Sequence, residues 1–322
     1  MANHSSTSSI LCASFNQDLS YFAVGTRDGF RIFETNSGKL CYERAVGAFV
    51  IVEMLFSSSL IAIVGAGDQP SLSPRRLSLF NTASGAASKE LNFLTSILAV
   101  RMNRERLVVI LQDKAYVYEM RSLSIVDIID TVPNNKGLCA FSPCLDACYL
   151  ALPASTTKGS ALLYNVMNRH LHCESYSFRR GTYPSTIFSL SFGPSKELPD
   201  ILAASSSSGS IHLFTLGFAS HPRSMSSSGF LGSIIPGAVS GVLDPAYHHV
   251  LHDAVPAGVK SYVVIRKVEN LTNSSSSELL ACRAILSVIT YNGFFKEYNI
   301  SINARNELSW ALGREFNLLT VT

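Results

Sequence analysis

Apolar and polar residues alternate over short stretches along most of the chain, and turns that contain Gly, Asn or Ser separate these stretches. Side chains at successive positions of a strand point to opposite faces of a sheet, so this alternation predicts many short strands. Six longer units repeat one order: an alternating strand, a turn, a run of β-formers, a second turn, and a strand that ends on an aromatic residue. These units occupy residues 11–39, 52–85, 97–120, 137–166, 187–217 and 261–301.

The aromatic residues that close the third strands give the repeat its spacing. They are Phe33, Phe80, Tyr118, Tyr164, Phe214 and Tyr298. The first four gaps between them are 47, 38, 46 and 50 residues, and a period of about 40 to 50 residues with four short strands is typical of a β-propeller. One four-stranded sheet cannot cover both of its faces, whereas radial packing of several sheets buries them. We therefore predict an all-β protein, a WD40-like propeller that forms a single domain over residues 1–322.

Two segments interrupt the strand pattern. A long insertion covers residues 218–258, and a Ser-rich loop covers residues 270–278. Within the insertion, Asp244 is suited to cap a helix and Pro245 to occupy its first position. The apolar residues that follow lie at i, i+3, i+4 and i+7, namely Tyr247, Val250, Leu251 and Ala254. The pattern predicts a short amphipathic helix that either contacts a membrane or a partner, or packs back on the propeller.

The composition agrees with a chain dominated by strands, because 47% of the residues are hydrophobic and only 15% are charged. The net charge of +3 is too small for a protein that coats nucleic acid, so any binding of anions must be local. The N-terminus lacks a basic region followed by an apolar stretch, and no apolar segment is long enough to cross a membrane. We expect a cytosolic protein without a signal peptide or a transmembrane segment.

Sequence patterns of enzymes are missing. The segment "GAGDQP" at Gly65 lacks the spacing of a nucleotide-binding loop, and His248 and His252 lack the glutamate that accompanies such a pair in zinc proteases. The cysteines within residues 139–148 are not spaced as zinc ligands. We expect no enzyme activity, no metal site and no cofactor, and we interpret the cysteines as small buried residues.

Two adjacent arginines, Arg179 and Arg180, stand out in a chain with little charge. They follow the alternating segment "SYSF" and precede Gly181, which favours a turn. On an outermost strand the two side chains would point to opposite faces, and hence toward two different crevices between blades. A planar guanidinium donates two parallel hydrogen bonds to a phosphate, so each arginine is suited to hold one anionic group.

Residues that suit phosphate binding follow the two arginines. They offer hydroxyl donors, glycines that are expected to expose backbone N–H groups, and a histidine. These candidates are Gly181, Thr182, Thr186, Ser205, Ser207, Gly209, Ser210 and His212. The alternative interpretation is an ordinary surface pair of arginines beside an ordinary Ser-rich turn.

The order of these motifs resembles the PROPPIN family, the WIPI-type, autophagy-related propellers with seven blades. The segment "FRRG" is followed by "TYPSTIFSLSF" and "LAASSSSGSIHLF", and the similarity extends from "FAVGTRDGFRIF" to "SVITYNGFFKEY". The resemblance implies that Arg179 and Arg180 each bind one head group of phosphatidylinositol 3-phosphate (PtdIns3P) or of the 3,5-bisphosphate. It also implies that a loop of the next blade inserts into the bilayer, for which the apolar candidates are Phe230, Leu231, Ile234, Ile235, Tyr247, Val250 and Leu251.

The resemblance further implies a role and a location. A family member would be a scaffold that is recruited to membranes and that recruits autophagy proteins. Its partners would be phosphoinositide membranes and autophagy proteins, with no nucleic acid among them. We expect such a protein in the cytoplasm, attached peripherally to preautophagosomal, endosomal or vacuolar membranes.

The chain departs from the family pattern just before "FRRG". The family normally has a further stretch between the fourth unit and "FRRG", so two blade periods, or roughly 80 to 100 residues, should separate Tyr164 from Phe214. In this chain the two residues are only 50 positions apart. About one blade is therefore missing, and with it most of the wall expected around Arg179, whereas the pocket of Arg180 keeps its wall. We expect six blades, an incomplete ring of seven, or a strand before "FRRG" that completes the preceding blade. The alternative function is a protein–protein scaffold whose lipid binding is impaired.

Overall fold

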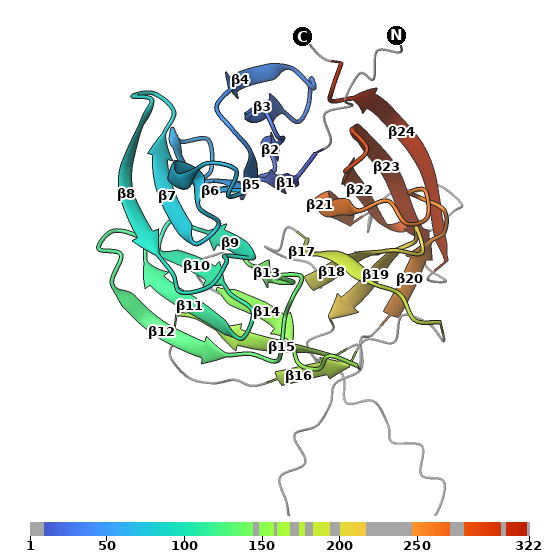
Figure 1. The fold of residues 1–322 in the computed structure, drawn as a ribbon. Coiled ribbons are helices and arrows are strands. Elements are labelled where there is room, and N and C mark those ends of the chain that lie inside the picture. Colours follow the sequence, from blue (N-terminus) through green and yellow to red (C-terminus); the bar gives the residue numbers. More distant parts are fainter. Residues whose placement is uncertain are drawn as a thin grey trace, which may run out of the picture.

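The computed structural model describes residues 10–143, 148–157, 160–167, 174–177, 183–193, 200–216, 247–270, 280–303 and 307–320. These residues form six antiparallel sheets of four strands each, arranged radially around a common axis (Figure 1). Each sheet is built from four strands that are consecutive in the described chain, with the first strand innermost. The prediction of an all-β propeller is confirmed, and the described part of the ring has six blades.

The first three blades lie within residues 12–130, and a short 3-10 helix, η1 (Pro70–Leu72), interrupts the second of them. Blade 1 contains β1 (Cys12–Phe15), β2 (Tyr21–Gly25), β3 (Phe30–Glu34) and β4 (Leu40–Arg44). Blade 2 contains β5 (Phe49–Met54), β6 (Leu60–Gly65), β7 (Arg76–Asn81) and β8 (Ala86–Asn92). Blade 3 contains β9 (Ala99–Met102), β10 (Arg106–Ile110), β11 (Lys114–Glu119) and β12 (Ile125–Asp130).

The last three blades carry the segments that the sequence marks as functional. Blade 4 contains β13 (Ala140–Phe141), β14 (Tyr149–Pro153), β15 (Ser160–Asn165) and β16 (Glu174–Ser177). Blade 5 contains β17 (Ile187–Phe192), β18 (Asp200–Ser206), β19 (Ile211–Leu216) and β20 (Tyr247–Leu251). Blade 6 contains β21 (Ser261–Asn270), β22 (Leu280–Thr290), β23 (Phe294–Asn303) and β24 (Leu308–Asn317).

The aromatic residues that gave the repeat its period all lie on the third strand of a blade. Phe33 and Phe80 lie on β3 and β7, Tyr118 and Tyr164 on β11 and β15, and Phe214 and Tyr298 on β19 and β23. All but Tyr164 are buried. A large aromatic ring at this position fills the widening space between two radially packed sheets, which explains why the residue type recurs with the blade.

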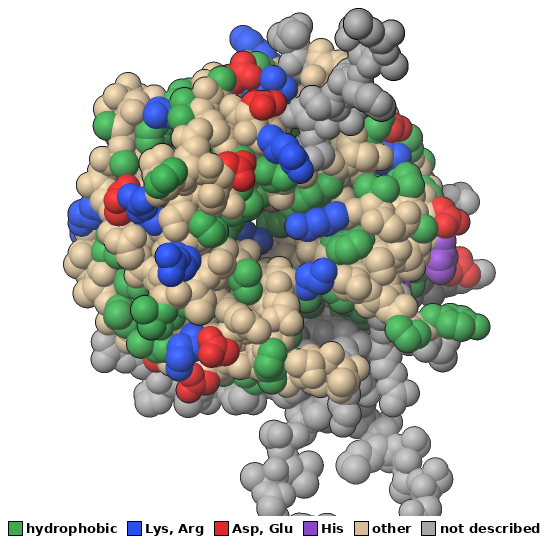
Figure 2. All heavy atoms as spheres, viewed as in Figure 1, with side chains coloured by type: hydrophobic (Ala, Val, Ile, Leu, Met, Phe, Trp, Pro, Cys, Tyr) green, Lys and Arg blue, Asp and Glu red, His purple; other side chains and the backbone are tan. Residues whose placement is uncertain are grey.

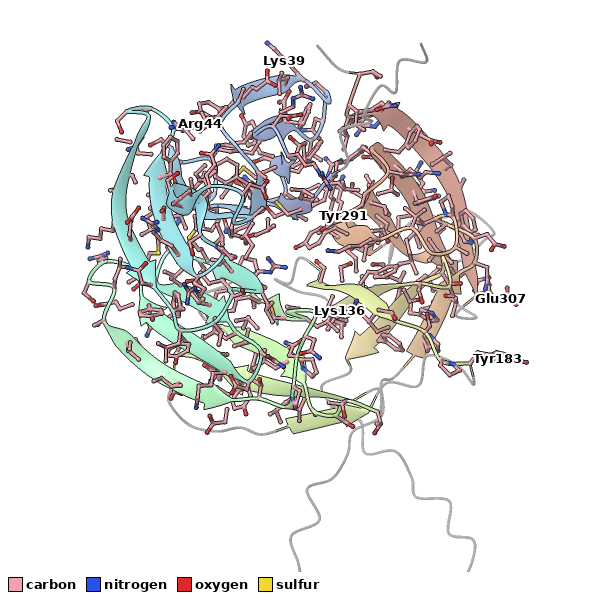
Figure 3. All side chains as sticks on the ribbon, in the orientation of Figure 1. Lys39, Arg44, Lys136, Tyr183, Tyr291 and Glu307 are labelled. Atoms are coloured by element: carbon pink, nitrogen blue, oxygen red, sulfur yellow. The ribbon has the colours of Figure 1, made fainter. Side chains whose placement is uncertain are left out.

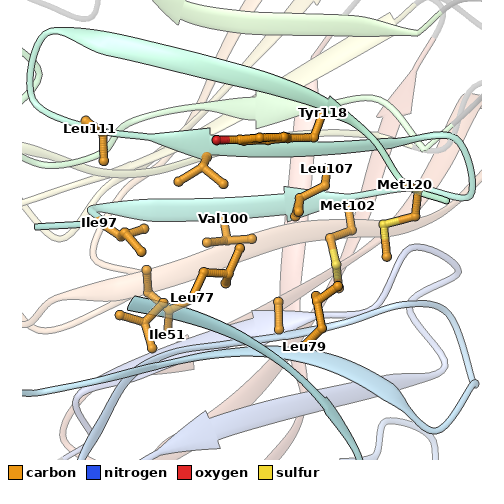
Figure 4. Packing of buried hydrophobic residues seen from close by; sticks show 13 residues of the cluster. Ile51, Leu77, Leu79, Ile97, Val100, Met102, Leu107, Leu111, Tyr118 and Met120 are labelled. Carbon is orange, nitrogen blue, oxygen red and sulfur yellow. The ribbon is translucent and has the colours of Figure 1, made fainter. Parts of the chain in front are cut away.

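The hydrophobic core lies between the blades and consists of one cluster for each neighbouring pair. The cluster between blades 2 and 3 joins Ile51, Leu77 and Leu79 of blade 2 to Val100 and Leu107 of blade 3 (Figure 4). Alternate residues of each strand contribute to the clusters on its two sides, as a sheet buried on both faces requires. The blades are therefore held mainly by non-directional apolar burial.

The seam between blades 6 and 1 closes the ring, and it combines stacked aromatic rings with an ionic cluster. The rings of Phe22 and Phe295 stack with centroids 5.4 Å apart. The Glu297 carboxylate accepts hydrogen bonds from Arg266 at 2.6 Å and from Arg314 at 2.7 Å. Both arginines also donate to Asn36, in the turn between β3 and β4. The first and last blades are thus joined by side chains.

The segment expected to form an amphipathic helix is a strand instead. Residues 247–251 form β20, the outer strand of blade 5, which pairs with β19 in the register Ile211↔Leu251 and Phe214↔His248. Leu251 is 0% exposed and belongs to the core between blades 5 and 6, so its assignment as a membrane contact is wrong. Pairing with β19 satisfies the backbone of this segment, and that tertiary contact outweighs its helical spacing.

Most of the expected membrane segment lies outside the described residues. This applies to the candidates Phe230, Leu231, Ile234 and Ile235, to Asp244 and Pro245, and to the side chain of Tyr247. Val250 is half-buried on β20. Of the Ser-rich loop, only Asn270 is described, as the last residue of β21. Within the described residues, no helix is long and apolar enough to span a bilayer.

Candidate functional site

The segment "FRRG" connects blade 4 to blade 5. Ser177 ends β16, the fourth strand of blade 4, and the description resumes at Tyr183, whose side chain is 85% exposed. The arginines and their first neighbours, Arg179, Arg180, Gly181 and Thr182, lie outside the described residues. β16 pairs with β15 in the register Ser160↔Ser177. The alternative in which the strand before "FRRG" completes the preceding blade is therefore confirmed.

The polar end of blade 5 begins where the chain enters β17. The exposed Thr186 is fixed by two hydrogen bonds to Ser207, because its N–H donates to Ser207 Oγ at 2.9 Å and its carbonyl accepts from Ser207 N–H at 2.8 Å. The hydroxyls of Ser185 and Ser207 lie 2.9 Å apart. The structure thus brings together two predicted site residues, Thr186 and Ser207, and adds Ser185, which the sequence analysis did not select.

The turn between β18 and β19 requires Gly209. Its φ of +81° lies in the left-handed region, and a Cβ at this position would meet the Val255 carbonyl oxygen at 2.3 Å. The Gly209 N–H donates to the Ser206 carbonyl at 3.1 Å, so the expectation that this glycine exposes its N–H group is wrong. Its role is to let the turn approach the following turn, where Gly258 N–H donates to the Ser207 carbonyl at 2.9 Å.

Hydroxyl groups project from this turn toward water. Ser208 is exposed, and Ser207 and Ser210 are half-buried. Ser208 Oγ accepts a hydrogen bond from Ser210 N–H at 3.4 Å and lies 2.9 Å from Ser206 Oγ. A serine hydroxyl can rotate to donate to an anion. The turn therefore presents several donors at the same end of blade 5 at which the chain arrives from "FRRG".

Ser205, another predicted site residue, belongs to the interior instead. Its hydroxyl donates to the Ser261 carbonyl at 2.9 Å and lies 2.8 Å from the Ser189 hydroxyl, while Ser189 Oγ accepts from Val263 N–H at 3.1 Å. These contacts join blade 5 to the innermost strand of blade 6. Ser205 is buried, and we therefore remove it from the candidate site.

His212 lies on β19, next to the turn but inside a stack of rings. Its Nδ1 lies 2.9 Å from Nε2 of His248 on β20, and the ring of His248 stacks on Phe214 with centroids 4.5 Å apart. His212 is 3% exposed, whereas His248 is exposed. Burial, and then the nearby His249, lower the pKa of His248. The stack lies on the face of blade 5 that is turned away from blade 6.

The pairing of His212 with His248 was missed in the sequence because 35 residues separate them. The available signal was the alternation around "YHHVL", which matches the alternation of β19. In the described residues, no group of three His, Cys, Asp or Glu side chains could hold a metal ion. Cys139 and Cys148 are buried, whereas Cys144 lies outside the description.

Comparison with known proteins identifies the family. The sequence model of the PROPPIN family matches residues 9–175. Autophagy-related protein 18b of Arabidopsis thaliana is 56% identical over an alignment of 364 positions that covers 100% of both chains. The chain belongs to the PROPPIN family. Autophagy-related protein 18 of Yarrowia lipolytica is 31% identical and covers 97% of each chain.

The alignment with the Arabidopsis relative also bears on the missing segment. It runs over 364 positions, whereas this chain has 322 residues, so at least 42 positions have no counterpart here. That length is about one propeller blade. The PROPPIN family match ends at residue 175, inside β16 and directly before "FRRG". The alignment length agrees with the absence of about one blade, and the family match ends at the junction where the sequence pattern is interrupted.

Solved structures of PROPPIN proteins share the fold. Kluyveromyces lactis Hsv2 superposes with a TM-score of 0.61 at 15% identity and covers 97% of this chain and 99% of its own. KlAtg21, solved in complex with a coiled coil of AgAtg16, gives a TM-score of 0.59 at 17% identity, with 96% and 99% covered. These similarities support the propeller architecture.

Proposed function

We propose that this PROPPIN protein is an autophagy scaffold that attaches to membranes by binding 3-phosphorylated inositol lipids. The observation that carries the proposal is the place at which the chain enters blade 5 after "FRRG", because Thr186, Ser207, Ser208 and Ser210 gather at this end of the blade. Arg180 would supply the charged fork for a head-group phosphate, and the hydroxyls would complete its coordination. The scaffold would act in the cytoplasm and on preautophagosomal, endosomal or vacuolar membranes.

The two arginines are not expected to contribute equally. In a complete family member, each would serve one pocket, but the blade that would form most of the Arg179 pocket is missing from this chain. Arg180 keeps the hydroxyl-rich end of blade 5 as its wall. One head-group site in place of two removes avidity on a membrane, which can amount to a hundredfold, so attachment is expected to be weak and short-lived.

The insertion between β19 and β20 would add an apolar contribution to attachment. Its candidates are now Phe230, Leu231, Ile234 and Ile235, because Leu251 belongs to the core. Burial of one such side chain in the bilayer interface contributes about 1.5–3 kcal/mol at most. This contribution does not weaken with salt, whereas the phosphate contact does.

Flotation of the full chain with vesicles tests the proposal. Vesicles of phosphatidylcholine with PtdIns3P should carry the protein, and plain phosphatidylcholine vesicles should not. Arg180→Ala should weaken binding roughly ten- to a hundredfold, as expected for a charge-assisted contact, and Arg179→Ala should weaken it less. Arg75→Ala, at an exposed arginine of blade 2, is the matched control. Equal losses for the two "FRRG" variants would contradict the asymmetry.

A second candidate function is protein binding without lipid binding, and the missing blade favours it. Failure of the chain to float with PtdIns3P vesicles at low salt would support this function. KlAtg21 was solved with a coiled coil of AgAtg16, and a coiled-coil segment of an autophagy protein is therefore the partner class that we propose. Pull-down with such a segment, performed on the lipid-binding-deficient Arg179→Ala/Arg180→Ala variant, separates the two functions.

A further inference from the structure

The central channel contains a polar cavity that the proposed lipid site does not use. It has a volume of about 100 Å³ and is lined by the innermost strands and by the turns that lead into them. Figure 2 shows a hollow at the centre of the visible face with basic side chains around it. The charged residues of the lining are Glu53, Arg101, Lys136 and Lys260. Within the described lining, three cations thus face one carboxylate.

A rigid turn presents Lys136 at the mouth of the cavity. Asn134 closes this turn, because its Oδ1 accepts from Leu138 N–H at 2.8 Å and its Nδ2 donates to the Leu138 carbonyl at 2.9 Å. Gly137 has a φ of +62°, and a Cβ there would meet the Leu98 carbonyl oxygen at 2.6 Å. The backbone that carries Lys136 is thus fixed, and Figure 3 shows this residue at the inner rim.

Lys260 approaches the same mouth from blade 6. Its Nζ lies 4.3 Å from the centre of the Tyr291 ring, a cation–π contact that holds the ammonium beside the cavity. Burial lowers the pKa of Lys260, and the positive charge of Lys136 lowers it further. The two ammonium groups are therefore near enough to repel each other, and an anion between them would relieve this repulsion.

Arg101 contributes unused donors at the bottom of the cavity. Its Nη1 donates to Glu53 Oε2 at 3.3 Å and to the Val100 carbonyl at 2.9 Å. Among the described residues, Arg101 has two hydrogen-bond acceptors, and Nη1 donates to both of them. The N–H groups of Nε and Nη2 therefore remain available to a ligand. Glu53 is 4% exposed, and burial raises its pKa to about 7 against the opposing effect of Arg101.

We propose that the channel binds a small dianion of the phosphate class between Lys136, Lys260 and Arg101. A cavity of about 100 Å³ has room for roughly three water molecules, or for one tetrahedral oxyanion in their place. Cations that line a narrow space concentrate the field on such an ion. The site lies on the ring axis and is separate from the "FRRG" end of blade 5.

The charge of Glu53 links this site to pH. Above neutral pH its carboxylate is ionised and repels the anion, whereas below neutral pH it is protonated and leaves Arg101 without a counter-ion. The other titratable groups that line the cavity with Glu53 come from several elements. They are Cys12 on β1, Arg101 on β9, Cys139 before β13, Tyr262 on β21, and Tyr291, Lys136 and Lys260 at the mouth. Affinity for a dianion of constant charge should therefore rise as pH falls from 8 to 6.

Calorimetric titration of the full chain with sulfate tests the proposal. Sulfate keeps its charge near neutral pH, whereas a phosphate group titrates there. We expect saturable binding, a loss of roughly a hundredfold in Lys136→Ser/Lys260→Ser from two charge-assisted contacts, and roughly tenfold tighter binding at pH 6 than at pH 8. Glu53→Gln should abolish this pH dependence. Lys39→Ser/Lys89→Ser, at exposed lysines in the turn before β4 and on β8, is the control of equal charge.

Two further measurements separate this site from the proposed lipid site. Lys136→Ser/Lys260→Ser should still float with PtdIns3P vesicles, and Arg179→Ala/Arg180→Ala should still bind sulfate. Circular dichroism and the melting temperature report whether each variant folds, and the single exposed Lys136→Ser replaces the double variant if the latter does not. Absence of saturable sulfate binding, or equal binding by the lysine variant, or a loss only in the arginine variant would overturn the proposal.

Discussion

Two seams of the ring differ in the way that neighbouring blades are joined. The cluster between blades 6 and 1 contains ten buried apolar residues, and the described part of the cluster between blades 4 and 5 contains Ala140, Ala151 and Leu202. The first seam joins the two ends of the chain, whereas the second joins blades that are consecutive in sequence. Two blades that are far apart in the sequence therefore share an extensive apolar contact.

The two seams also differ in their place relative to the interruption of the family pattern before "FRRG". Faces that belong to a complete ring, such as those of blades 6 and 1, match each other in volume and in charge, as shown by the Phe22–Phe295 stack and the Glu297 cluster. If one blade is missing before "FRRG", as we infer, blades 4 and 5 meet through two faces that would each have packed on that blade. We therefore expect this seam to be less complementary than the one between blades 6 and 1.

The largest expected effect comes from truncation of the aromatic seam. Phe295→Ala should lower the free energy of unfolding by about 4 kcal/mol, because a fully buried ring leaves a cavity. Leu202→Ala, which truncates a smaller buried side chain between blades 4 and 5, should cost about 2 kcal/mol, the lower end of the range for Leu→Ala. Urea unfolding at constant pH measures both. A larger loss for Leu202→Ala would reverse the order of the two seams.

The ionic cluster should come next in size. Glu297→Ala leaves Arg266 and Arg314 without their shared carboxylate in a mostly buried position, and we expect a cost of about 3 kcal/mol. Glu43→Ala, which removes the exposed partner of Arg31, should cost less than about 1 kcal/mol. Melting temperatures of the two variants provide the comparison, and similar values would show that the cluster contributes little to ring closure.

A pair of glycines tests whether the stability of blade 5 depends on the close approach of its β18–β19 turn to the turn that leads to blade 6. Gly209 and Gly258 both have a φ of +81°, but only at Gly209 would a Cβ collide with backbone. Gly258→Ala should cost about 1 kcal/mol from backbone strain alone, and Gly209→Ala about 2 kcal/mol or more. Equal costs in chemical denaturation would mean that the close approach of these two turns is not required.

The smallest effect concerns the histidine pair on the other face of blade 5. The pKa of His248 is lowered in the folded state, so the unfolded chain binds the proton more readily. The contribution of neutral His248 to the free energy of unfolding is therefore present above its ordinary pKa of about 6.5 and is lost as the pH falls below that value. His248→Gln should remove on the order of 0.5 kcal/mol of pH dependence between pH 8 and 5, because solvent screens the ring. Urea unfolding of this variant and of the unchanged chain at pH 8 and at pH 5 measures the difference.

The sequence was sufficient for the blades because strand alternation and the aromatic period are local signals. The helix prediction for residues 247–251 was wrong, because the apolar spacing fits a helix whereas pairing with β19 makes the segment a strand. Ser205 and Ser207 look alike in a run of serines, yet Ser205 contacts blade 6 and Ser207 contacts Thr186. The contacts of each serine depend on the neighbouring blade, and the pairing of β19 with β20 depends on the register across a long insertion. A local sequence pattern carries no information about either.

In the described chain each blade consists of four consecutive strands, and the first and last blades meet through side chains without exchanging a strand. A closed ring of this kind has no preferred starting point, so its coding sequence could begin between any two blades. Deletion of a stretch that encodes one blade leaves every other sheet intact. The size of the ring can therefore change by one whole unit in a single genetic event, after which selection acts mainly on the newly formed seam.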